Sequence, residues 1–134
     1  MEKNKTIVFE QFARKAAERL EERKKLRTER LRVKSIDMEI EIRGLSDAEM
    51  HDCMDFSDDN IEQDRYTLFM ASSTLQEAGK ILKENGTLQQ EYKIAEMFTA
   101  VEQSYMVNRV LELSGYKGNP DIEVIKEEDE VKNS

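Results

Sequence analysis

The stretch from residue 36 to residue 50 constrains the fold of this chain more than any other part of the sequence. Apolar and charged residues alternate over residues 36–43, which is the period of a strand with one buried face. Gly44 can adopt the backbone conformation of a turn. Ser46, followed three residues later by Glu49, is the pattern of a capping box, which starts a helix. The apolar members of the alternation are Ile36, Met38, Ile40 and Ile42.

The same stretch also indicates what this corner does not do. Leu45 and Met50 are spaced to form a hydrophobic staple across the start of the helix. Neither the G-x-G-x-x-G nor the G-x-x-x-x-G-K-[ST] pattern of phosphate-binding loops occurs. We therefore predict a structural corner, in which a strand turns into a helix, rather than the entrance to a nucleotide site.

Length and composition favour one small, mostly helical domain. The chain has 134 residues, of which 38% are hydrophobic and 37% charged, a balance typical of a well-solvated globular protein. No apolar run approaches the roughly 20 residues of a membrane span, and the N-terminal residues lack the pattern of a signal peptide. We expect a cytoplasmic protein without a membrane partner. Cys53 is the only cysteine, which excludes an internal disulfide and a cysteine-based zinc cage.

Charge is divided unevenly along the chain. Residues 13–34 hold ten Lys and Arg against four Glu, a balance of +6, whereas residues 35–134 hold nine against twenty-three, a balance of −14. A basic end can contact nucleic acid, an acidic partner or the acidic body of the protein itself. Apolar residues at helical spacing predict a helix in this segment: Phe9, Phe12, Ala16 and Leu20. We predict that residues 1–34 form a mostly helical basic segment.

The middle of the chain contains several helix signals. The run "YTLFMASS", residues 66–73, fits a strand by alternation and a buried helix by its flanks, and we favour a helix. The stretches "TLQE" at 74–77 and "TLQQ" at 87–90 fit capping boxes, and Gly86 fits a left-handed helix end.

The last large element ends near Gly115. Its apolar face predicts either one long helix or two shorter ones, because "TAVE" at 99–102 fits a helix start inside the run. If Gly115 ends the helix in a Schellman motif, Tyr116 would fold back and contact Leu111. Beyond this point, we predict a flexible, charged, acidic tail over residues 119–134.

No catalytic or metal-binding pattern emerges. Five potential ligands lie close together, but their spacing matches neither a zinc finger nor a calcium loop: His51, Cys53, Asp55, Asp58 and Asp59. The only histidine is two residues from the only cysteine, and side chains two apart on a helix do not face each other. We expect a short helix and an acidic loop here, with Asp58 to Asn60 supplying caps, and neither a cofactor, a metal nor an enzymatic activity.

The order of these features resembles the XkdN-like tail assembly chaperones of phages and prophages. The resemblance covers roughly residues 37–116 and rests on the segments "EIRGLSDAE", "LQEAG" and "VLELSGY". The chain departs from the family where Ala100 and Val101 replace a Pro-Gly pair before Glu102. It also departs before "LQEAG", where the family has a proline and this chain has Ser72, Ser73 and Thr74.

The resemblance implies a non-enzymatic protein of the bacterial cytoplasm that keeps the tape measure protein soluble during virion assembly. Its client would be the amphipathic helices of that protein, with the tail tube protein as a second candidate partner. We expect part of the binding surface on the closing helix, although Met and aromatic side chains there also suit a core. The candidate contact residues are Met97, Phe98, Val101, Tyr105 and Met106.

The predicted architecture is mainly α with a small β element. One compact helical domain holds a strand near residues 36–43, with a protruding basic N-terminal helix and a flexible acidic tail; we place the chaperone-like domain at residues 35–118. Two alternative functions remain open. One is a nucleic-acid-associated regulator that uses Arg14 to Lys34, which lacks a helix-turn-helix pattern. The other is a generic helical adaptor that forms homo-oligomers through its first helix.

Overall fold

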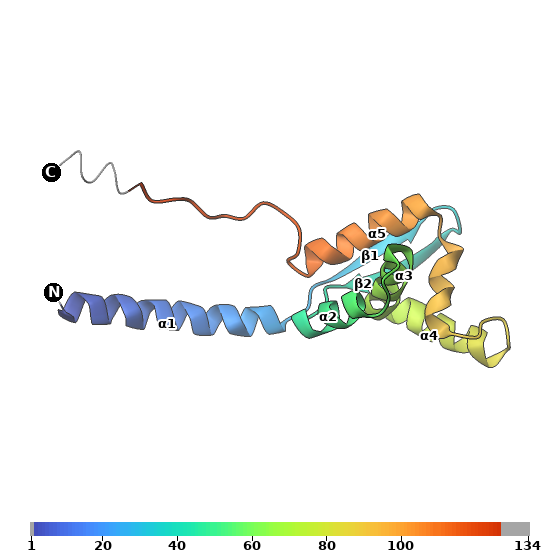
Figure 1. Cartoon of the computed structure of the whole chain (residues 1–134), viewed down its shortest axis with the longest axis horizontal. Helices are drawn as coiled ribbons and strands as arrows, with labels where there is room; N and C mark the ends of the chain where they lie inside the picture. The colour runs from blue at the N-terminus through green and yellow to red at the C-terminus, as the bar shows by residue number, and fades with distance from the viewer. Residues whose placement is uncertain (1, 127–134) are drawn as a thin grey trace.

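The computed structural model describes residues 2–126 and confirms a mainly helical fold with a small β element (Figure 1). Its two strands form one antiparallel sheet, and helices pack against that sheet. The elements of the described residues are α1 (Glu2–Lys24), β1 (Thr28–Val33), β2 (Met38–Arg43), α2 (Asp47–Asp55), α3 (Asn60–Ala71), α4 (Ser73–Glu84), the 3-10 helix η1 (Glu91–Met97) and α5 (Ala100–Leu113).

The predicted corner between strand and helix is confirmed. Ile40 and Ile42 of β2 are buried. The Glu49 N–H donates to Ser46 Oγ (3.2 Å), and the Ser46 N–H donates to Glu49 Oε1 (3.0 Å), so the capping box that starts α2 is complete. Gly44, however, serves a different purpose from the one predicted. Its φ is not positive, and a Cβ there would lie 2.5 Å from the Leu113 carbonyl oxygen, so glycine lets the end of α5 approach.

Strand β1 lies inside the basic segment and was not predicted. It pairs with β2 in an antiparallel register that places Leu31 opposite Ile40 and Val33 opposite Met38. Leu31 and Val33 thereby share a face with Ile40, and all three side chains join the core or pack against it. The basic segment is therefore one helix followed by one strand of the sheet.

Helix α1 protrudes from the body, as predicted, and runs away from it for its whole length (Figure 1). Phe9, Phe12 and Leu20 are exposed along it. Near its end, Arg23 Nη2 donates to both carboxylate oxygens of Asp47 at 3.2 and 3.3 Å, so an exposed ion pair joins α1 to the start of α2.

The core lies where α3 meets the sheet and the other helices. Helix α3 contacts α2, α4, η1, α5 and β2, and its Leu68 and Ala71 are fully buried. The run at residues 66–73 is thus helical up to Ala71, which confirms the predicted helix. Asp59 caps α3 through the Ile61 N–H (2.9 Å), which confirms a cap within the acidic loop.

The helix signals that follow are confirmed only in part. Helix α4 begins with the Ser72 side chain as its cap rather than Thr74, and the predicted box at residues 87–90 is wrong because η1 has no side-chain cap. The predicted end at Gly86 is confirmed by its φ of 83°.

The closing region is two helices. Thr99 and Glu102 form the capping box of α5, and the break before it occurs at Phe98. At the other end, the Tyr116 N–H donates to the Leu111 carbonyl (2.8 Å) and the Gly115 N–H to the Glu112 carbonyl (3.1 Å), which is the predicted Schellman motif. Residues 119–126 have no regular secondary structure, and the rest of the predicted tail lies outside the described residues.

Candidate functional site

The structure divides the five predicted contact residues into two groups. Met97, Val101 and Tyr105 are exposed, and Val101 retains 80% of its accessible surface. Phe98 and Met106 are only 5% and 3% exposed and belong to the core. The structure therefore places these two in the core rather than among the exposed side chains, although each also lines one of the grooves described below.

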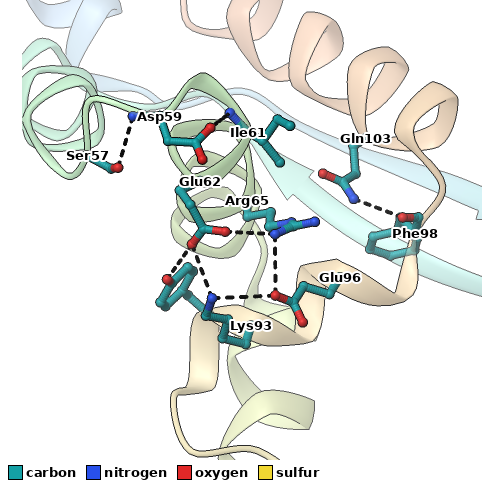
Figure 2. Close-up of polar contacts among 10 residues, drawn as sticks. Ser57, Asp59, Ile61, Glu62, Arg65, Lys93, Glu96, Phe98 and Gln103 are labelled. Atoms are coloured by element: carbon teal, nitrogen blue, oxygen red, sulfur yellow. Dashed lines mark hydrogen bonds and ion pairs between the residues drawn. The ribbon is translucent and has the colours of Figure 1, made fainter.

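The periodicity of α5 explains this division. Its inward face carries Met106, Val107 and Val110, which pack in the core, whereas Val101 and Tyr105, four residues apart, share the opposite face. Phe98 is fixed just before the helix, where its carbonyl accepts a hydrogen bond from Gln103 Nε2 at 2.8 Å (Figure 2).

The turn of the β hairpin adds two further apolar side chains. Met38 and Ile36 were predicted to extend the buried face of the strand, but both are exposed. Ile36 lies in the turn at residues 34–37, and Met38 is the first residue of β2. Both positions lie at the hairpin end, beyond the part of β2 that the core covers.

These five exposed residues surround the hairpin end, and we call them the tip surface: Ile36, Met38, Met97, Val101 and Tyr105. Two hollows flank the hairpin there. A nearly apolar groove of about 180 Å³ lies beside Ile36, Met38 and Met97. A groove of about 500 Å³ lies between β1 and α5, beside Val101 and Tyr105. Val33 lines both grooves, so the hairpin forms the ridge between them.

Polar contacts hold the hairpin against α5. Ser35 Oγ donates to Glu102 Oε2 (2.5 Å), and this hydrogen bond, with that of the Thr99 backbone, lowers the pKa of Glu102. Further along, Arg109 donates to both carboxylate oxygens of Glu29 at 2.9 and 2.5 Å, which lowers the pKa of Glu29. The larger groove is thus bounded by two elements that are tied together at both ends.

A separate polar network fixes η1, which carries Met97 (Figure 2). Glu62 of α3 accepts hydrogen bonds from Tyr92 Oη (2.5 Å), Arg65 (2.7 Å) and Lys93 (3.4 Å). Glu96 Oε1 forms ion pairs with Arg65 Nη1 at 3.3 Å and with Lys93 Nζ at 3.5 Å. The Tyr92 hydrogen bond is the main cause that lowers the pKa of Glu62, and the same bond raises the pKa of Tyr92.

This network positions η1 against α3. Each carboxylate in it has cationic or hydroxyl partners. Phe56 stacks on Tyr66 with centroids 4.0 Å apart, and Tyr92 of η1 meets Phe56 edge-on at 4.9 Å, so aromatic packing also holds η1.

The potential metal ligands of residues 51–59 do not converge on one point. His51 is exposed and lies 3.3 Å from Asp55 along one turn of α2, whereas Cys53 is buried on the other side of that helix, where burial raises the pKa of its thiol. Among the described residues, no group of three or more His, Cys, Asp or Glu could hold a metal ion.

The basic segment has much of its charge compensated. Half of its ten cations lie within 4.0 Å of a carboxylate: Lys15, Arg23, Lys24, Arg30 and Arg32. This segment therefore does not present an uninterrupted cationic face of the kind that binds phosphates.

Comparison with known proteins gives no relative for this chain. No protein family, no curated protein and no solved structure matches it. Over the residues that the structure describes, none of the helices has both the length and the apolar character needed to cross a membrane.

Proposed function

We propose that this protein is a non-enzymatic assembly chaperone of a phage or prophage tail. It would bind amphipathic helices of the tape measure protein in the bacterial cytoplasm and keep that protein soluble. The observation that carries the proposal is the tip surface, where exposed apolar side chains from the hairpin, η1 and α5 gather at one end of the body. Apolar side chains clustered on a surface, rather than scattered, are typical of a binding site.

The shape of the tip surface suits a helical client. An amphipathic helix presents apolar side chains at intervals of three and four residues, and a groove on each side of the hairpin ridge can receive them. Met38 and Met97 contribute flexible thioether side chains, which adapt to ligands of varied shape. Such a surface fits a chaperone that must accept several segments of one long protein.

The charge of the body suits a chaperone as well. Residues 35–134 carry a balance of −14, so complexes of chaperone and client repel one another and stay dispersed. Near the tip, Arg30, Arg32 and Lys34 line the larger groove and can attract acidic residues on the polar face of a client helix.

Co-expression of the full chain with the tape measure protein encoded beside its gene tests the proposal. We expect the tape measure protein to become soluble and to co-purify. The double variant Met38→Glu with Val101→Glu should abolish both effects, because buried charges in the complex would lack partners. Met54→Glu is the matched control, since Met54 is also exposed but lies on α2 and outside the tip surface.

Two results would contradict the proposal at different levels. A tape measure protein that stays insoluble and unbound beside the wild-type chain refutes the chaperone function itself. Undiminished binding by the double variant, with the variant shown to be folded by circular dichroism, leaves the function standing and rejects the tip surface as its site.

Helix α1 supports a second candidate function, an adaptor that forms homo-oligomers. Phe9, Phe12 and Leu20 are exposed on a helix that runs clear of the body. Sedimentation velocity of Phe9→Glu with Phe12→Glu tests it: a shift of the wild-type oligomer to monomer supports the adaptor, and a monomeric wild type rejects it. A truncated variant that lacks α1 should end its deletion at Lys24, because β1 begins at Thr28 and belongs to the sheet.

A further inference from the structure

The outer edge of β1 is an unpaired strand edge. The Gly44 N–H donates to the Arg27 carbonyl (2.8 Å), and the antiparallel register then directs alternate backbone groups toward β2. Thr28, Arg30 and Arg32 direct their N–H and carbonyl groups the opposite way. Within residues 2–126, β2 is the sole strand that pairs with β1. Such an edge is a template for one further strand.

The larger groove of the tip surface lies along this edge. Its walls are residues 30–35, from β1 and the hairpin turn, and the exposed face of α5 with Val101 and Tyr105. A strand added to β1 would lie in the plane of the sheet, and every second side chain would point toward α5. The groove therefore suits an extended segment with apolar residues at alternate positions.

The positive charges beside the edge favour a segment that carries negative charge. Arg30, Arg32 and Lys34 are exposed there, and Arg30 and Arg32 reach across to Glu39 and Asp37 of the hairpin. Exposed ion pairs of this kind contribute little to the stability of the fold, so either arginine can pair with another carboxylate instead. A second copy of β1 would place Arg and Lys opposite Arg and Lys, which is unfavourable. An acidic segment meets no such repulsion.

The chain itself contains a segment of this description. Residues 121–126 read Asp-Ile-Glu-Val-Ile-Lys, so Asp121 and Glu123 alternate with Ile122 and Val124, and the segment has a net charge of −1. β-Branched residues favour strands. In the structure this segment runs away from the body, where Ile122 and Val124 are 84% and 86% exposed (Figure 1). Two large apolar side chains thus lack a partner on the same molecule that has an open edge.

The segment starts close enough to reach the edge. The Leu45 N–H donates to Ser114 Oγ (2.8 Å), and Arg27, Leu45 and Gly115 line one common groove, so α5 ends beside the start of β1. The five residue steps from Tyr116 to Asp121 span at most about 17 Å, whereas the chain advances only about 10 Å from Arg27 to Arg30. A chain that crosses to the edge after Tyr116 and then runs parallel to β1, with Asp121 beside Arg30, therefore brings Ile122 and Val124 to the hairpin end.

We propose that residues 121–126 dock on the outer edge of β1 as a third, parallel strand, with Ile122 and Val124 packed against Val101 and Tyr105. The docked and extended arrangements interconvert through the residues after α5, where Gly118 has a φ of 120°. Docking covers part of the tip surface, so a client must displace the segment to bind there. The inference does not depend on which client that is.

Amide hydrogen exchange of the full chain, followed by NMR, tests the docked strand. We expect the Arg30 and Arg32 amides of the wild type to exchange at least about tenfold more slowly than in Ile122→Asp with Val124→Asp. Ile125→Asp is the matched control, because residue 125 would point away from α5 and its change should preserve the protection. The Leu31 amide, which pairs with β2, should be protected in all three proteins and reports an intact sheet.

Three outcomes would overturn the proposal. Equal exchange of the Arg30 and Arg32 amides in the wild type and the double variant shows that the edge stays open. Equal loss of protection in Ile125→Asp shows that the packed face is not the one assigned. Protection that rises with protein concentration shows that the strand comes from a second copy rather than from the same chain.

Discussion

The ion pair between Arg43 and Glu49 joins three elements, and Glu49→Gln is the change that tests its contribution. Arg43 donates to both carboxylate oxygens of Glu49, at 2.9 and 2.7 Å. The same guanidinium reaches the Met70 carbonyl of α3 at 3.4 Å. Glu49 also accepts the Ser46 N–H in the capping box. The side chains of Arg43 and Glu49 are 31% and 25% exposed, so solvent reaches the pair only in part.

The magnitude follows from the pKa of Glu49. The Arg43 hydrogen bonds, together with those of Ser46, lower it from 4.5 to about 2. A shift of that size would contribute at most about 3 to 4 kcal/mol to the free energy of unfolding, at about 1.4 kcal/mol per pKa unit. Because water still screens the pair, we expect roughly 1–2 kcal/mol.

The sign of the pH dependence is fixed by the direction of the shift. A lowered pKa stabilises the folded protein at pH values above 4.5, where the unfolded carboxylate is also ionised, and this contribution is lost as the pH falls toward 2. Urea unfolding at pH 7 should therefore show Glu49→Gln less stable than the wild type. At pH 3, the difference between the two proteins should fall by more than half.

Glu102→Gln is the matched control, because Glu102 occupies the same position in the capping box of α5 but has no arginine partner among the described residues. We expect Glu102→Gln to lower the free energy of unfolding by only a few tenths of a kcal/mol at pH 7. If Glu49→Gln and Glu102→Gln are equally destabilising, or if the Glu49→Gln effect is the same at pH 7 and pH 3, the Arg43 pair does not stabilise the fold as argued.

Further predictions concern the packing of the body. Gly44→Ala should lower the free energy of unfolding by about 1–3 kcal/mol, since its Cβ would overlap the Leu113 carbonyl. Gly86→Ala, which meets no atom within 4 Å but has a φ of 83°, should cost about 1 kcal/mol. Leu68→Ala should cost about 2–5 kcal/mol, because the side chain is fully buried; urea titration measures all three. Cys53 should react with a thiol reagent far more slowly in the native protein than in urea, because its thiol is buried and its pKa raised.

The features that sequence predicted correctly depend on neighbours along the chain. The capping box at Ser46, the helix end at Gly86 and the Schellman motif at Gly115 each require residues within about one turn of each other. Local hydrogen bonds of this kind are specified by residue type and spacing, so they can be read without knowledge of the fold.

The features that sequence missed depend on distant partners. Strand β1 has only Leu31 and Val33 as apolar residues, and it forms because β2 supplies the other half of the ladder. Gly44 matches a turn residue by type, but the glycine is required by the end of α5, about seventy residues later in the chain. Neither relationship leaves a local pattern.

Only part of the candidate site could be predicted, because exposure also depends on distant partners. Periodicity identified an apolar closing helix, but it could not say which of its faces the body covers. Val101 and Met106 are equally apolar in sequence, and only the position of the sheet makes the first exposed and the second buried. Met38 was expected in the core because its strand alternates, and the end of the hairpin leaves it outside.

The positions of the termini bear on how the molecule can work. Helix α1 and the segment after α5 both leave the body at one end, where Arg23 pairs with Asp47 and the Tyr116 hydroxyl donates to the same carboxylate at 3.2 Å (Figure 1). The tip surface lies at the other end, around the hairpin turn. A partner on α1 and a client on the tip surface would therefore not exclude each other. The acidic segment 121–126, in contrast, can return along β1 to the tip, so it is the part of this chain placed to compete with a client.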